Sequence, residues 1–132
     1  MSLSRRTIPV FLFCALALAV VIYGAVGKKN QTLDGLVVEE NTFYEFYPGV
    51  KGCQKQGTRY WLVPNREFYE TVHTSTDPEH LDRLFHGSWQ ITLNGDLSHI
   101  GRYGYQEKYW RELSVRYVVK AIQLSCDDAP VR

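Results

Sequence analysis

The longest hydrophobic segment of the chain lies near its N-terminus. Residues 8–27 carry no charged side chain, and an arginine pair precedes this run while a lysine pair follows it. At a helical rise of about 1.5 Å per residue, the run covers roughly 30 Å, the thickness of the hydrocarbon core of a bilayer. A helix satisfies its own backbone hydrogen bonds in lipid. The pattern therefore predicts one transmembrane helix within residues 1–30.

A cleaved secretory signal is the alternative for this segment. Such signals have an apolar core of about 7–15 residues that ends in a small-x-small site. Residues 17–19 could form that site, but the apolar residues 20–22 follow, and the run is longer than an ordinary signal core. We therefore expect the anchor to stay uncleaved. The positive charge is slightly greater before the run than after it, which favours a cytoplasmic N-terminus.

Residues 31–132 are rich in aromatic and β-branched side chains, which favour strands. A chain of this length supports one modest core, so we expect a single domain, tethered by residues 28–32. Asp77 followed by Pro78 is a helix start signal, and it predicts a short helix that ends near Phe85. This helix separates the third and fourth of five predicted strands, at residues 36–47, 59–63, 66–74, 88–93 and 108–124.

The spacing of apolar residues predicts how several strands are oriented and where the chain turns. Apolar and polar side chains alternate along residues 88–93, as in a strand with one buried face. Asn94-Gly95 predicts a tight turn directly after it. In the last strand the apolar positions change face, which predicts a bulge near Val119-Lys120. In the first strand, alternation places on one face Phe43, Glu45 and Tyr47.

Two cysteines, Cys53 and Cys126, lie in the predicted domain. They suit one structural disulfide in an oxidising compartment, and the alternative is a pair of unrelated buried thiols. A bond between them would close a loop of about 73 residues, which the chain-entropy model values at roughly 4 kcal/mol. For one small domain that is a large contribution.

The charge of the domain argues against nucleic acid as a partner. Eleven of the fifteen Lys and Arg residues lie within residues 31–132, against all fourteen Asp and Glu residues, so the net charge there is −3. Basic patches that would bind phosphates are absent from the sequence.

No residue pattern points to a metal or a catalytic centre. The histidines, His73, His80, His86 and His99, lack the tight pairing that zinc sites favour. Cys53 would need a histidine and a carboxylate beside it to act as a nucleophile, and the linear sequence places neither there. We therefore expect neither a cofactor nor enzymatic activity.

Several motifs give the domain a resemblance to a known fold. They are Phe46 and Cys53 ahead of Tyr60-Trp61-Leu62, Trp89-x-Ile91-x-Leu93 leading into Gly95-Asp96-Leu97-Ser98, Gly101-Arg102-Tyr103-Gly104, and Tyr109-x-Arg111-Glu112-Leu113-x-Val115. With five strands and one helix between the third and fourth, residues 43–119 resemble the OB-fold, a small Greek-key barrel. Within that class they are similar to small exported bacterial OB-fold envelope proteins and to the OB domain of copper-responsive envelope-stress lipoproteins. The chain departs from the lipoproteins in lacking a lipidation site and a second cysteine near Cys53.

The resemblance implies a pairing and a surface. In OB barrels the first strand pairs in part with the last, so Cys53 and Cys126 could approach each other. The face around the second and third strands, with its adjoining loops, is the usual ligand surface, where aromatic side chains can stack on a ligand or peptide. The alternative is that half of these aromatic residues fill the barrel. The candidate binding face comprises Tyr60, Trp61, Phe68, Tyr69, Tyr103, Tyr105 and Tyr109.

Together these features predict a mainly β protein with an N-terminal transmembrane helix and an OB-like barrel. The uncleaved anchor, residues 1–30, would cross the bacterial inner membrane once, and the exported domain, residues 31–132, would lie in the periplasm. The function we expect is a non-enzymatic interaction module, an accessory component that binds other proteins of an envelope complex. The alternative is a metal- or stress-sensing envelope protein, which would need histidine or cysteine ligands that converge in space.

Overall fold

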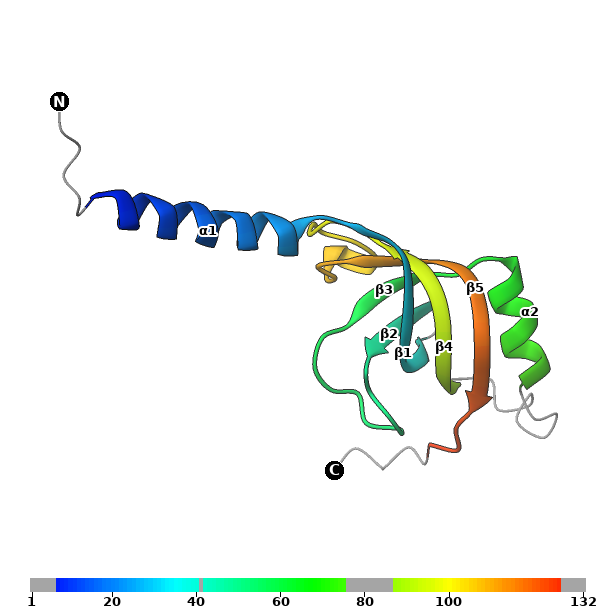
Figure 1. Cartoon of the computed structure of the whole chain (residues 1–132). Helices are drawn as coiled ribbons and strands as arrows, with labels where there is room; N and C mark the ends of the chain where they lie inside the picture. Colours follow the sequence, from blue (N-terminus) through cyan, green and yellow to red (C-terminus); the bar gives the residue numbers. More distant parts are fainter. Residues whose placement is uncertain (1–6, 41, 76–86, 127–132) are drawn as a thin grey trace.

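The computed structural model describes residues 7–40, 42–75 and 87–126. Helix α1 (Thr7–Ala25) projects from one end of the globular domain, and only two residues separate it from strand β1 (Lys28–Glu40) (Figure 1). The domain is mainly β, with five strands and a helix between β3 and β4, as predicted. The elements after β1 are β2 (Phe43–Pro48), β3 (Tyr60–Val63), α2 (Arg66–Ser75), β4 (Ser88–Leu97), a 3₁₀ turn (Tyr105–Glu107) and β5 (Glu112–Gln123).

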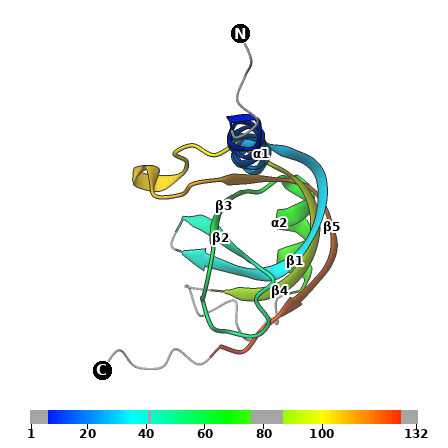
Figure 2. The same ribbon diagram turned by 60° about the vertical axis from the view of Figure 1, so that its left-hand side comes forward.

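The strands form a closed barrel in the order β1-β2-β3-β5-β4. Neighbouring strands are antiparallel, except that β3 and β5 run parallel. A parallel pair needs a long crossover connection, and here α2 and β4 lie between its two strands in the chain. Figure 2 shows the ring of strands from a second direction, with α2 beside β5.

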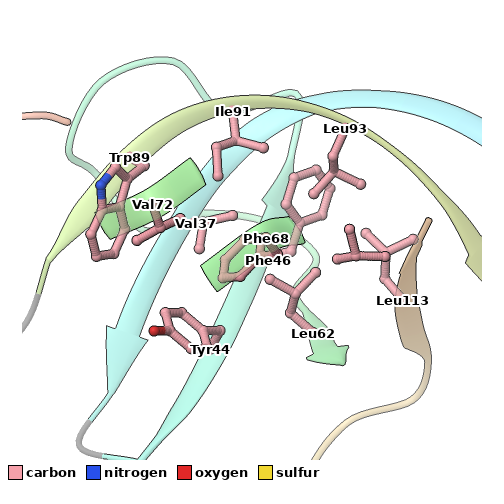
Figure 3. Close-up of a cluster of buried hydrophobic side chains, with 11 residues drawn as sticks. Val37, Tyr44, Phe46, Leu62, Phe68, Val72, Trp89, Ile91, Leu93 and Leu113 are labelled. Atoms are coloured by element: carbon pink, nitrogen blue, oxygen red, sulfur yellow. The ribbon is translucent and has the colours of Figure 1, made fainter. Parts of the chain in front are cut away.

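The main core fills the inside of the barrel (Figure 3). Helix α2 contributes Phe68 and Val72, which lie four residues apart and therefore share one face of the helix. The same helix begins with a side-chain cap, because the backbone N–H of Phe68 donates to Asn65 Oδ1 at 2.9 Å. The strands supply the rest of the core, which includes the fully buried side chains of Val37, Phe46, Leu62, Ile91, Leu93 and Leu113.

A second, smaller apolar cluster lies on the outer face of β1 and β2. Its buried members are Leu36, Val38, Tyr47 and Val50, and Leu124 packs against them. The loop after β2 and the segment after β5 thus cover strand residues that would otherwise face solvent. A disulfide joins these two segments, with the Cα atoms of its cysteines, 53 and 126, at 5.5 Å. The predicted disulfide is confirmed.

Helix α1 carries its apolar side chains outward along the part that is described. Large hydrophobic residues from Val10 to Ile22 are each more than half exposed. Within the described part of the chain, no helix was found that combines the length and the apolar character needed to cross a membrane. The predicted transmembrane helix is therefore not confirmed.

The predicted first strand, residues 36–47, is wrong in both its start and its continuity. It consists of the second half of β1 and most of β2, which pair as an antiparallel hairpin. The predicted tether at residues 28–32 is the beginning of β1, where residues 31–32 pair with residues 94–95 of β4. No linker therefore separates α1 from the barrel.

The predicted third strand, residues 66–74, is wrong because this segment is helix α2. Its alternating aromatic and β-branched residues resemble a strand, but the cap at Asn65 and the helical spacing of its buried residues decide for the helix. The helix predicted from Asp77 to about Phe85 lies outside the described residues.

Strand β4 continues through the predicted turn. Asn94 is buried and Gly95 pairs with Val115, so the turn prediction is wrong. A Cβ at Gly95 would lie 2.6 Å from the carbonyl oxygen of Ser114, so glycine permits a close backbone approach at this point. The predicted bulge is confirmed, because Thr92 pairs with Lys120 and Leu93 with Val118, which leaves the residue between them unpaired.

Candidate functional site

Aromatic side chains gather on the outer face of β2 and β3. The rings of Phe43 and Trp61 lie 5.0 Å apart, and Trp61 lies 5.3 Å from Tyr109. Tyr105 stacks on Phe43 at 6.1 Å. We call these four residues the outer aromatic cluster. Gly104 brings the loop between β4 and β5 onto this cluster, because a Cβ there would lie 2.3 Å from the Trp61 ring.

A buried carboxylate lies beside the outer aromatic cluster. Glu45 is only 4% exposed, although it is on the outer face of β2. It accepts hydrogen bonds from the hydroxyl of Tyr47 at 2.6 Å and from the hydroxyl of Tyr109. The guanidinium of Arg59 lies 3.3 Å from the carboxylate and 5.1 Å from the centre of the Tyr109 ring. The carboxylate is thus occupied by donors from its own chain.

The protonation of the two tyrosines fits their role as donors to Glu45. Burial, reinforced by the hydrogen bond to Glu45, raises the pKa of Tyr47 to about 12. The same causes raise the pKa of Tyr109. Both hydroxyls therefore keep their protons throughout the physiological range. The network fixes the loop between β4 and β5 to the face of β2.

The structure divides the seven residues of the predicted binding face among several places. Trp61, Tyr105 and Tyr109 meet in the outer aromatic cluster, and sequence reasoning did not include their neighbour Phe43. Phe68 is fully buried inside the barrel. The remaining three residues are Tyr60, Tyr69 and Tyr103.

These three tyrosines lie in different environments. Tyr60 is partly buried against the main core, stacked on Phe46 at 6.4 Å. Tyr103 is half-buried in the loop between β4 and β5, where its hydroxyl donates to the carbonyl oxygen of His99 at 3.1 Å. Tyr69 is 42% exposed on α2. Among the seven, Tyr69 and Tyr105 therefore offer the most exposed rings.

Tyr69 lines a surface groove of about 660 Å³ at the beginning of α2. Asn65 positions this part of the helix, since its side-chain amide donates to the carbonyl oxygens of Val115 and Arg116 on β5. We call this pocket the α2 groove. Its lining residues are Pro64, Asn65, Arg66, Tyr69, Glu70 and His73.

Sequence reasoning included only Tyr69 from the α2 groove. The sequence signal for the other lining residues was a helix start at Pro64-Asn65. Asn65 is a capping residue, and Glu67 places an acidic side chain in the first helical turn. Once the segment is taken as a helix, residues 66, 69, 70 and 73 share a face by their spacing of three and four.

No metal site was found among the described residues, and Cys53 is not a free thiol. Among the described residues, no group of three or more His, Cys, Asp or Glu side chains is placed to hold a metal ion. His73 lies at the α2 groove and His99 in the loop between β4 and β5, whereas His80 and His86 fall outside the described residues. Cys53 is bonded in the disulfide.

A scan against protein-family models, a search of curated proteins and a search of solved structures each found no match for the chain.

Proposed function

We propose that this protein is a membrane-anchored, OB-like binding module, an accessory component of a protein complex in the bacterial cell envelope. Its globular domain would face the periplasm and bind another envelope protein without catalysing a reaction. The architecture, the location and the binding surface each rest on separate observations.

The strand order supports an OB-like architecture. An OB-fold is a five-stranded Greek-key barrel, and here β1 pairs with both β2 and β4 while β3 and β5 run parallel. The helix between β3 and β4, and its contribution of Phe68 to the barrel interior, agree with the same architecture.

The apolar N-terminal run supports the anchor. Residues 8–27 lack charged side chains. Within α1 the structure describes the side chains of residues 10–22 and 25, so the apolar run is longer than the described part. The exposed side chains of α1 would be costly in water and favourable in lipid. The disulfide supports the periplasmic side, because such bonds persist in oxidising compartments.

The proposed binding role rests mainly on the α2 groove. It combines an exposed aromatic ring, Tyr69, with the ion pair of Arg66 and Glu70 at 2.7 Å, so it offers apolar contact next to charged groups. Tyrosine and arginine are enriched in protein interfaces. Beside the outer aromatic cluster, the Glu45 carboxylate is occupied by Tyr47, Tyr109 and Arg59. Cys53, elsewhere on the barrel, is bonded in the disulfide, so neither group is free to react, which supports a role without catalysis.

A photo-crosslinking amino acid tests this role in the full chain within native membranes. Placed at position 69 or at position 73, where the native histidine is exposed, it should give a discrete adduct of higher mass. The control position is Gln54, an exposed residue in the loop between β2 and β3. This loop lies away from α2 in Figure 1.

The expected result is an adduct at positions 69 and 73 and none at position 54. The same partner should accompany the unmodified protein during extraction in a mild detergent. If neither groove position gives an adduct and the protein is extracted as a lone monomer, the accessory-module proposal is wrong.

A further inference from the structure

The loop between β4 and β5 is joined to the base of helix α1. The backbone N–H of Ile100 donates to the carbonyl oxygen of Ala25 at 3.0 Å. The guanidinium of Arg111 donates to the carbonyl oxygens of Val26 and Ser98, at 3.4 and 3.1 Å. Residues 98–111, which we call the junction loop, therefore lie at the end of the barrel from which α1 leaves (Figure 1).

The close approach of the two segments depends on a glycine. A Cβ at Gly27 would lie 2.9 Å from the carbonyl oxygen of Leu97 and 3.0 Å from the backbone nitrogen of His99. Strand β1 begins at the next residue. The junction loop, the end of α1 and the start of the barrel are thus packed backbone against backbone.

The junction loop exposes apolar side chains that the barrel leaves uncovered. Trp110 is 74% exposed and Ile100 is 45% exposed, and the backbone of Ile100 is bonded to Ala25, next to the exposed Val26 at the base of α1. Tyr105 is exposed on the same loop. In water, exposed apolar side chains of this kind favour aggregation. Tryptophan and tyrosine are, in contrast, enriched at the interface between a membrane and water.

The charges around the junction loop are mainly positive. The loop carries Arg102, Lys108 and Arg111 against one acid, Glu107, which pairs with Arg102 at 3.8 Å. Two further lysines begin β1, and two acids, Asp96 and Glu112, flank the loop, so positive charges still outnumber negative ones. Basic residues close to a bilayer are attracted to anionic phospholipids. Apolar side chains flanked by basic ones are typical of segments that lie in the membrane interface.

The junction loop is held in place from the side of the barrel. The backbones of Tyr103 and Tyr109 form a β-bridge, and the Tyr109 hydroxyl donates to buried Glu45. Gly104 rests on the ring of Trp61. Trp110 therefore follows a residue that is fixed to the domain.

We infer that the junction loop is a second membrane contact, which inserts Trp110 and Ile100 into the interface of an anionic bilayer. This inference rests on the proposed anchor, because α1 would bring the loop to the membrane surface. With no linker between α1 and β1, the contact would hold the barrel in one orientation above the bilayer. The α2 groove would then face a fixed direction.

Quenching of tryptophan fluorescence by brominated lipid tests this contact. The full chain is reconstituted into vesicles of equal parts phosphatidylcholine and phosphatidylglycerol, with bromine near the top of the acyl chains. The three tryptophans, Trp61, Trp89 and Trp110, all lie outside α1, and Trp89 is buried in the barrel. Bromine should quench the wild-type emission, and Trp110→Phe should lose most of that quenching.

A relocated tryptophan is the matched control. In the double variant Trp110→Phe/Ile122→Trp, the new ring lies at an exposed position near the far end of β5, about 30 Å along the strand from the junction loop. It should not be quenched. Equal quenching of wild-type and Trp110→Phe protein, or none in either, would overturn the inference.

Flotation of the same vesicles separates this inference from the proposed anchor. Protein that floats with the vesicles but shows no quenching through Trp110 has an anchor without a loop contact. Protein that fails to float has no anchor, and both proposals are then wrong.

Discussion

Replacement of Cys53 and Cys126 by alanine should lower the free energy of unfolding by about 4 kcal/mol. The disulfide closes a loop with a sequence separation of 73 residues, and in the chain-entropy model its loss restores that freedom to the unfolded chain. The bond also lies next to Leu124, which packs against the second, smaller apolar cluster on the outer face of β1 and β2. Chemical denaturation of the full chain in detergent, followed by far-ultraviolet circular dichroism, measures the change.

Cys14 provides the matched control for this measurement. It is a free, exposed cysteine on α1, so Cys14→Ala should leave the unfolding of the barrel unchanged. Reduction of the wild-type protein should reproduce the loss seen in the double variant. A double variant within about 1 kcal/mol of the wild type would show that the bridge contributes little, contrary to its typical value of 2–4 kcal/mol.

Substitution of Glu45 by alanine should cost about 2–4 kcal/mol of stability, because it leaves the hydroxyls of Tyr47 and Tyr109 buried without their acceptor. Arg59 would lose its partner as well, although its side chain is 45% exposed and can turn toward water. The same denaturation experiment measures the loss.

The control for Glu45 is another carboxylate of the same hairpin. Glu40 pairs with Lys55 at the surface, and surface ion pairs contribute at most about 1 kcal/mol, so Glu40→Ala should have a small effect. Glu45→Gln keeps an acceptor oxygen and should lose less than Glu45→Ala. Equal effects of the substitutions at positions 40 and 45 would contradict the role of the buried network.

The elements predicted best from the sequence are those whose pattern is set by one buried face. Alternation in residues 88–93 located β4, and the change of apolar face after Val119 located the bulge in β5. The opposite faces of β2 were also predicted, and the structure places Phe46 inside the barrel and Tyr47 outside. In each case local spacing alone carries the information.

The secondary-structure predictions are wrong at places where long-range contacts outweigh the local conformational preference of the residues. Residues 28–32 are polar and were interpreted as a tether, but pairing with β4 makes them part of β1. A glycine such as Gly95 is typical of turns, but here it permits the backbones of β4 and β5 to approach each other closely. In α2, the cap at Asn65 and burial of Phe68 override a strand-like composition.

The candidate site was less predictable than the fold, because exposure depends on what covers each strand. The aromatic residues of β3 and the junction loop were identified from the sequence as one surface, and three of them do meet. The burial of Tyr109 follows from Glu45, which occupies an outer position of β2 and had no predicted partner. No local pattern shows that a loop more than 60 residues away supplies that partner.

The membrane anchor is the central claim, and extraction of membranes with alkaline carbonate tests it most directly. The full chain is followed by an antibody to its C-terminus in cells that express it without further modification. If residues 8–27 are an uncleaved anchor, the protein remains in the membrane pellet at its full mass of 15.3 kDa. Release into the supernatant, or recovery as a soluble form shortened by loss of its N-terminal run, would contradict the account.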